Sequence, residues 1–307
     1  MKKVLSLLIA LALVLSVVTP VHAQRGGRGS LTPEQRAERL LAQERALQEA
    51  LKAPTPIDAL DSIWIEELTW MEVRDELASG KTTAIISTGG IEQNGPYLAT
   101  GKHNFVLRGA CDRIARKLGD ALCAPIISLV PEGNHSPPSG HMRYPGTISL
   151  RQETFEALLT DVASSLKVHG FENIIFIGDS GGNQRGMENT AKILNEKWGE
   201  KVAYYIPEFY RYGDVSKYAE QTFGIKQVSE GIHDDFVITS LMMLTDPSSV
   251  RYDQRVAVGK ASIKGVSIVP KEKTIEIGNA LMNFRVDRTI KAIKEAMSAG
   301  RPTGNIS

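Results

Sequence analysis

The sequence predicts an α/β fold built on a mostly parallel sheet. From residue 64 onward, short apolar runs alternate with amphipathic segments at helical spacing. Residues 174–177 are apolar throughout, as strands covered on both faces of a parallel sheet are. Residues 83–86 form another apolar run and lead into a glycine-rich loop, residues 87–104. A strand that delivers such a loop above a sheet is typical of α/β enzymes.

Length and composition predict one sizeable domain that follows an N-terminal tail. The chain has 307 residues, of which 42% are hydrophobic, enough for a large core. We expect a signal peptide at residues 1–23, a flexible segment with one amphipathic helix at 24–56, and an α/β domain at 57–307. The net charge of +1 gives no electrostatic reason to expect nucleic acid, so the expected partner is a small-molecule substrate.

The first residues have the pattern of a secretory signal. Lys2 and Lys3 precede an apolar run at residues 4–18, and Ala23 closes a small-x-small cleavage site. The apolar run is short for a bilayer span, and no stop-transfer pattern follows it. We therefore expect an exported, periplasmic protein that begins near Gln24 and is not attached to a membrane after cleavage.

Capping and periodicity locate the elements in chain order. Thr32 opens a capping box for a helix that extends to about Lys52, and Thr69 caps a helix through Leu77. Later segments follow from apolar spacing: helices at 105–118, 154–168, 184–198 and 284–297, and strands at 123–130, 174–177 and 201–206. A short β-rich region is expected before the last helix.

The two cysteines of the chain allow two interpretations. Cys111 falls on a predicted helix and Cys123 at the start of a predicted strand. Export permits a disulfide, but pairing depends on geometry, and we favour two buried free thiols. Two cysteines are too few for a thiolate metal cluster.

Several motifs resemble those of the creatininase (creatinine amidohydrolase) family, in the family's order. The signature G-x-x-E-Q-H-G-P-H-L-P-x-G-T-D is matched at Gly89, Glu92, Gln93, Gly95, Pro96, Leu98 and Gly101. Residues 141–150, 178–183 and 233–243 resemble the family's H-x-x-F-P-G-T-I-S-L, N-G-H-G-G-N and H-A-G-x-x-E-T-S-L-M-L. The resemblance covers roughly residues 64–251. It implies a three-layer α/β/α fold with a mostly parallel sheet, and a homo-oligomer.

The chain departs from the family at metal-ligand positions. Family members use the Glu of the signature, the His two residues on and the Asp eleven residues on to hold two metal ions. These positions hold Glu92, Asn94 and His103 here. Ser180 stands where a family histidine binds metal, and Ile238 at a family glutamate. Amide and hydroxyl groups are poor zinc ligands and isoleucine is none, so an unchanged two-metal centre is not expected.

A rearranged site for a single ion is predicted instead. Glu92, His103 and Asp179 follow two strands at their carboxyl ends, where open α/β sheets gather ligands. One imidazole and two carboxylates suit zinc or manganese, with iron possible, and leave positions for water and substrate. By the resemblance, His233 would be the catalytic acid/base group.

Four further side chains are expected to bind substrate. Asn94, Tyr97 and Asn183 suit hydrogen bonding to a polar small molecule. His141 lies in a long loop, residues 131–147, and its match to the family's H-x-x-F-P-G-T places it near the pocket.

Two other functional interpretations remain open. Glu92 can cap a helix and Asp179 can brace a glycine loop, so the chain can be a catalytically inactive creatininase-fold small-molecule-binding protein. Residues 178–182 also resemble a G-x-S-x-G elbow, which would make Ser180 a nucleophile with His233 as its base.

The main hypothesis is a metal-dependent amidohydrolase. It would cleave a C–N bond of a small cyclic or linear amide, with Glu92, His103 and Asp179 holding the metal and His233 transferring protons. Creatinine itself is not the expected substrate, because the ligand positions differ from those of the family.

Overall fold

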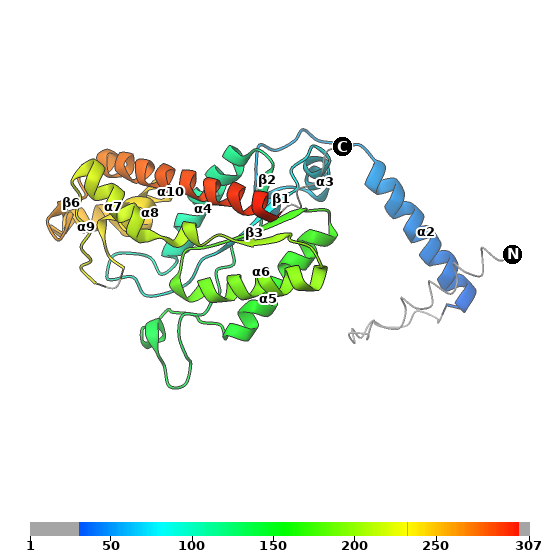
Figure 1. Ribbon diagram of the computed structural model, residues 1–307, viewed down its shortest axis with the longest axis horizontal. Coiled ribbons are helices and arrows are strands. Elements are labelled where there is room, and N and C mark those ends of the chain that lie inside the picture. The colour runs from blue at the N-terminus through cyan, green and yellow to red at the C-terminus, as the bar shows by residue number, and fades with distance from the viewer. Residues whose placement is uncertain (1–30, 232, 301–307) are drawn as a thin grey trace. The chain divides into compact units, whose positions relative to one another are not determined.

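The computed structural model describes residues 31–231 and 233–300, which form parts of two compact units (Figure 1). The first unit comprises residues 1–54 and the second residues 55–307. The predicted signal peptide lies outside the described residues. No described helix combines the length and apolar character that a membrane span requires.

The described part of the first unit consists mainly of one helix, α2 (Pro33–Lys52). Thr32 Oγ1 accepts a hydrogen bond from the Gln35 N–H at 3.2 Å, and Gln35 Oε1 accepts one from the Thr32 N–H at 3.0 Å. The predicted capping box is therefore confirmed. None of the side chains of α2 is buried.

The second unit is organised around a four-stranded parallel sheet. Its strand order is β2 (Ala121–Cys123), β1 (Thr83–Thr88), β3 (Asn173–Gly178), β4 (Ala203–Tyr205). Every residue of β1 and β3 is buried, as expected for central parallel strands. The strand predicted at 123–130 is wrong in extent, because β2 ends at Cys123 and Pro125 cannot donate to a ladder.

Helices cover both faces of the sheet and confirm the three-layer architecture. Figure 1 shows α5 (Gln152–Val168) and α6 (Gln184–Trp198) on one side and α4 (Lys102–Leu118) and α10 (Lys271–Gly300) on the other. The remaining helices are α3 (Trp70–Ala78), α7 (Tyr212–Phe223), α8 (Phe236–Thr245) and α9 (Tyr252–Ala257). Short 3-10 turns join them, among them η2 (Gly140–Arg143) and η3 (Gly181–Asn183).

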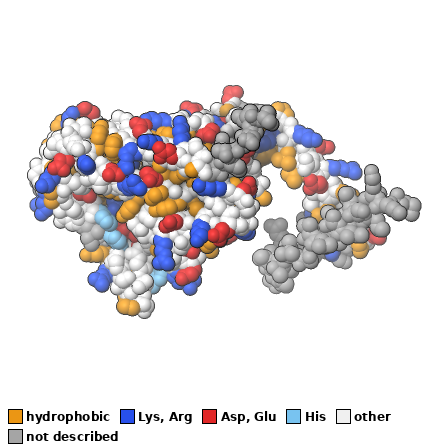
Figure 2. Space-filling view, in the orientation of Figure 1, with side chains coloured by type: hydrophobic (Ala, Val, Ile, Leu, Met, Phe, Trp, Pro, Cys, Tyr) orange, Lys and Arg blue, Asp and Glu red, His pale blue; other side chains and the backbone are white. Residues whose placement is uncertain are grey.

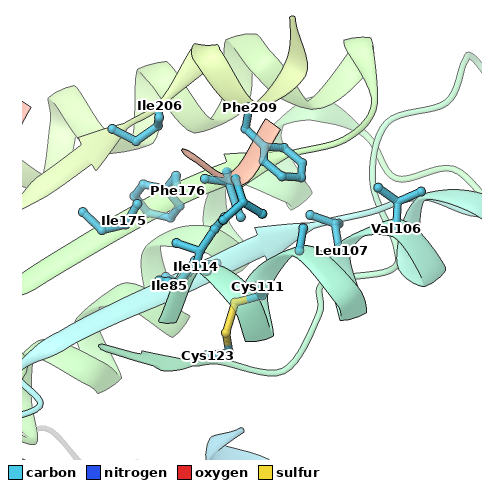
Figure 3. Close-up of a cluster of buried hydrophobic side chains, with 14 of the residues drawn as sticks. Ile85, Val106, Leu107, Cys111, Ile114, Cys123, Ile175, Phe176, Ile206 and Phe209 are labelled. Atoms are coloured by element: carbon cyan, nitrogen blue, oxygen red, sulfur yellow. A yellow bond between two sulfur atoms is a disulfide. The ribbon is translucent and has the colours of Figure 1, made fainter. Parts of the chain in front are cut away.

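The core covers both faces of the sheet, and Figure 3 shows part of it. Ile85 of β1, Ile175 of β3, and Leu107 and Ile114 of α4 belong to this cluster, and all four side chains are fully buried. Lys and Arg side chains are interspersed with Asp and Glu on the face shown in Figure 2.

Helices α4, α5 and α10 begin earlier than predicted, α5 by only two residues. α4 starts at Lys102, so His103 lies in its first turn. α10 starts at Lys271, because buried side chains such as Ile277 and Leu281 extend its apolar face toward the N-terminus. The predicted β-rich region is reduced to a small hairpin of β5 (Ser262–Ile263) and β6 (Val266–Ser267).

The two cysteines form a disulfide, so the preference for free thiols was wrong. Cys111 of α4 and Cys123 at the end of β2 have Cα atoms 6.3 Å apart, within the range a disulfide spans. The helix packs on the sheet with Cys111 facing β2, as Figure 3 shows. This packing could not be read from sequence spacing.

Removing the disulfide is expected to destabilise the second unit. The bridge joins residues 12 apart, and a loop of this length contributes roughly 3 kcal/mol by restricting the unfolded chain. The double variant Cys111→Ala/Cys123→Ala should lose about this much unfolding free energy in urea denaturation. Reductant should lower the stability of the wild-type protein and leave the double variant unchanged. Equal midpoints for the oxidised wild-type protein and the double variant would contradict this prediction.

Candidate functional site

A cavity of about 500 Å³ contains most of the predicted site residues. It is lined by residues that follow β1 and β3, by α4, and by the loop that carries η2. Its ionisable lining includes Glu92, Lys102, His103, Glu132, His141, Asp179 and His233. The cavity therefore lies at the carboxyl edge of the sheet, where parallel α/β folds bind ligands.

Glu92 is the centre of this cluster and is only 1% exposed. Its Oε1 lies 2.9 Å from Lys102 Nζ and 2.9 Å from His103 Nε2. His233 Nδ1 lies 2.8 Å from the same oxygen, and His141 Nε2 lies 3.2 Å from Oε2. Burial alone would raise the pKa of Glu92, but the hydrogen bonds from His103 and His233 and the charge of Lys102 hold it well below its usual value.

The glycine-rich loop and the start of α4 together position these groups. Gly90 lies two residues after the end of β1. Its backbone packs so close to Glu132 that a Cβ there would lie 2.2 Å from Glu132 Oε1. The first turn of α4 presents Lys102 and His103, which both point back to Glu92. A glycine and an early helix start are therefore the local requirements for the cluster.

Asp179 orients His103 from the side opposite Glu92. Its Oδ2 lies 2.8 Å from His103 Nδ1, while its Oδ1 accepts from Arg285 Nη2 at 2.5 Å and from the Tyr212 hydroxyl at 2.7 Å. Asp179 is completely buried, which raises its pKa, yet the charge of Arg285 and the bond from His103 bring the pKa below its usual value. Both carboxylate oxygens are therefore already engaged.

This arrangement changes the role predicted for Asp179. Glu92, His103 and Asp179 do lie together, but as a hydrogen-bonded row with the imidazole in the middle. A shared ion would need all three to face one point. Asp179 belongs to neither group of described residues that could hold a metal ion, and its contacts suit the orientation of His103.

Two overlapping sets of side chains could hold a divalent metal ion. The outer group comprises Glu92, His141 and His233, and the inner group comprises Glu92, His103 and Glu132. In each group the ligand atoms lie within 4.8 Å of one another. Carboxylate and imidazole are ligand types for zinc and manganese. Glu132 Oε1 is buried without a hydrogen-bond partner among the described residues, as an oxygen available to a cation would be.

Glu132 was not among the predicted site residues. It is 6% exposed, and Ser180 Oγ donates to its Oε2 at 3.5 Å. Burial and the neighbouring charge of Glu92 raise the pKa of Glu132 to about 9. Its position two residues after the apolar run at 123–130 was the available signal, since that places it at the carboxyl edge of the sheet.

His141 and His233 meet at the mouth of the cavity. Their ring centroids are 5.1 Å apart, and the side chains are 21% and 42% exposed. His233 has a φ of 60°, a left-handed conformation that is uncommon outside glycine and often marks functional positions. Both histidines therefore face the carboxylate of Glu92, although one was predicted to bind substrate and the other to transfer protons.

Three residues predicted to bind substrate, Asn94, Tyr97 and Asn183, do not line the cavity. Asn94 Nδ2 donates to the Glu92 carbonyl at 2.8 Å, and Asn183 Nδ2 donates to the Gly89 carbonyl at 2.8 Å. The guanidinium of Arg255 lies over the Tyr97 ring, 4.6 Å from its centroid. These side chains brace the loops that carry the site.

Two cationic residues were also missed. Lys102 and His103 stand where the family signature has threonine followed by aspartate. The replacement of threonine by lysine was the signal that could have identified Lys102. Arg285 stands four residues after the buried Leu281 on α10. A charged residue within a buried stripe indicates a buried ion pair, here with Asp179.

The geometry of Ser180 disfavours a nucleophilic elbow. Its φ of −104° and ψ of 147° are extended, whereas an elbow holds its serine in a strained turn. Its hydroxyl donates to Glu132, and no hydrogen bond to His233 is present among the described residues.

Breaking the pair of Arg285 and Asp179 is expected to destabilise the protein. Arg285→Met leaves a buried carboxylate unpaired and should lower the unfolding free energy by about 3–5 kcal/mol in urea denaturation. Arg288→Met is the matched control on the same helix, because its pair with Asp214 is partly exposed and should contribute no more than about 1 kcal/mol. The double variant Arg285→Met/Asp179→Asn should lose less than the sum of the single losses. Additive losses would argue against the pairing.

The sequence was also compared with known proteins. The model of the creatininase family, described as creatinine amidohydrolase, matches residues 66–293. Creatinine amidohydrolase of Pseudomonas putida is 26% identical over 116 residues, which cover 38% of this chain and 44% of that protein. The 3-dehydro-scyllo-inosose hydrolase of Thermotoga maritima is 27% identical over 197 residues, 63% of this chain and 60% of that protein. The chain thus matches less than two thirds of the length of either relative.

Solved creatininase structures share the fold. A mutant creatininase of the Zn-Zn type superposes with a TM-score of 0.56 at 22% identity, covering 79% of this chain and all of that one. A manganese creatininase gives a TM-score of 0.56 at 20% identity, with the same coverage. The family match spans most of the second unit and agrees with this fold. The chain therefore belongs to the creatininase family.

Proposed function

We propose that the protein is a metal-dependent amidohydrolase that cleaves a C–N bond of a small cyclic or linear amide. The observation that carries this proposal is the convergence of Glu92, His141 and His233 at the mouth of the cavity. Membership in the creatininase family supports a metal-dependent amide hydrolase in general terms. The cavity volume of about 500 Å³ suits a small substrate.

We assign the metal to the outer group, with zinc or manganese as the candidate ion and iron as a further possibility. Such an ion would supply polarisation of the substrate carbonyl and activation of a water molecule. Glu92 presents one oxygen to each histidine, and Asp179 holds His103 so that its Nε2 faces Glu92. His141 is 21% exposed and His233 is 42% exposed, which leaves this group accessible to solvent and substrate.

This assignment makes His233 a ligand rather than the proton-transfer group. Proton transfer then falls to Glu132, which lines the same cavity and whose Oε1 has no hydrogen-bond partner among the described residues. The polar lining also includes Tyr210, Gln227 and Asp235, which suit a substrate with several hydrogen-bonding groups. Ile238 lines this cavity without any ligand atom.

Removing a ligand is expected to remove the metal. His233→Ala should lose its bound divalent ion in elemental analysis and lose hydrolysis of small amides, whereas His135→Ala should keep both. His135 is the matched control, because its Nε2 contacts the Ser149 carbonyl and it belongs to neither ligand group. A His233→Ala protein with full metal content and no activity would return the proton-transfer role to His233.

The same measurements separate the hydrolase from a non-catalytic binding protein. A wild-type protein with no stoichiometric divalent metal, even after reconstitution, would favour the catalytically inactive small-molecule-binding alternative. The substrate screen should include cyclic and linear amides. It should also include 3-dehydro-scyllo-inosose, for which one relative is named.

We also propose that the protein is exported to the periplasm and acts there on a small molecule as a homo-oligomer. The pattern of residues 1–23 supports export, and so does the disulfide, because such bonds persist in oxidising compartments. N-terminal sequencing of exported protein should begin near Gln24. A chain that retains residues 1–23 would contradict cleavage.

A further inference from the structure

We infer that the ammonium group of Lys102 occupies the inner cation position of the site, so the chain binds one divalent metal ion rather than two. This inference rests on the proposed function, because it concerns which of the two ligand groups takes the metal. The inner group, Glu92, His103 and Glu132, has suitable ligand atoms. A cation carried by the protein, the Lys102 ammonium, already contacts Glu92, the member that this group shares with the outer group.

The ammonium of Lys102 lies beside Glu92, one of the three residues that would bind an inner ion. Its side chain is 2% exposed and lines the cavity. Its Nζ lies 2.9 Å from Glu92 Oε1, and His103 Nε2 lies 2.9 Å from the same atom. The ammonium and the inner imidazole therefore converge on one carboxylate oxygen.

The charges around Lys102 oppose a second ion. A buried ammonium requires a paired anion, and Glu92 is the carboxylate that pairs with it among the described residues. The carboxylate of Asp179, which is also fully buried, already forms an ion pair with Arg285 and is therefore not available to Lys102. A metal bound at about 2.1 Å from Oε1 would lie within roughly 5 Å of Nζ. Such an ion would either repel Lys102 or displace it from its partner.

The outer group has one ligand oxygen outside this conflict. His141 Nε2 lies 3.2 Å from Glu92 Oε2, the oxygen that does not contact Lys102, whereas His233 Nδ1 lies 2.8 Å from Oε1. Both histidines of the outer group reach solvent, so an ion can enter and leave. The site thus combines one exchangeable metal position with one permanent positive charge on α4.

The test is the number of ions bound, which does not depend on activity. Metal-free protein would be titrated with Zn²⁺ and with Co²⁺, and the ions per chain counted by calorimetry and elemental analysis after desalting. The wild-type chain should bind one. Lys102→Met removes the charge and keeps the length of the side chain, and should bind two, the second at least about tenfold more tightly than any second ion on the wild type.

Further variants separate the two positions. His141→Ala should bind none in the wild-type background and one in the Lys102→Met background, because only the inner group remains there. Lys291→Met is the matched control, since Lys291 is 77% exposed on α10 and its loss should leave one ion per chain.

Specific outcomes would overturn the inference. Two ions on the wild-type chain, or a single ion on both the wild type and Lys102→Met, would show that Lys102 does not serve the inner position and would leave the proposed hydrolase intact. A wild-type chain that binds none would contradict the proposed function instead. The wild-type count decides the question even if Lys102→Met does not fold, and Lys102→Gln provides a second variant.

Discussion

The buried carboxylate of Glu92 is the interaction on which the site depends. At 1% exposure, its negative charge has lost its hydration and must be stabilised by nearby donors. Those donors come from separate parts of the chain: the first turn of α4, the turn η2 and the residue His233 ahead of α8. The charge of Glu92 therefore links the start of α4, the turn η2 and the segment before α8, which are far apart in the sequence.

A second buried carboxylate extends this arrangement to the end of the chain. Asp179 follows β3 and is paired with Arg285 of α10, 106 residues later. Arg285 Nε also donates to the Phe209 carbonyl at 2.7 Å, so the guanidinium is fixed in place. Because Asp179 in turn holds His103 Nδ1, the terminal helix determines which ring nitrogen faces Glu92. A helix distant in sequence thus determines the chemistry available inside the cavity.

Local signals predicted the fold better than the site. The capping box at Thr32, the helix cap at Thr69 and the limits of α6 follow from short sequence patterns, and the structure confirms them. The disulfide and the early start of α10 depend on how helices pack on the sheet, which spacing does not reveal. The position of Glu92 beside His103 was predicted from a motif, because both residues lie in one loop and the helix that follows it.

Pairing between buried charges was the part that the sequence could not supply. Lys102, Glu132 and Arg285 carry ordinary charged side chains, and such residues usually face solvent. Their roles become visible only in the folded structure, where each charge has lost its hydration and is stabilised by a neighbouring group. Asp179 was recognised as important, but its two oxygens are taken by donors from other elements, so its role differs from the one predicted.

The side-chain amides of Asn94 and Asn183 were expected to bind substrate, but they hydrogen-bond to the backbone. A glycine-rich loop leaves backbone carbonyls without strand or helix partners, and buried carbonyls must be satisfied before any ligand is bound. Asn94 Nδ2 meets this need at the carbonyls of Glu92, Ala99 and Thr100, at 2.8, 3.1 and 3.4 Å. Asn183 does the same for Thr88 and Gly89. Near this cavity the amides therefore stabilise the loops, and the charged and imidazole groups remain for chemistry. That division of roles explains how the family position at Asn94 can lose a metal ligand without losing the shape of the site.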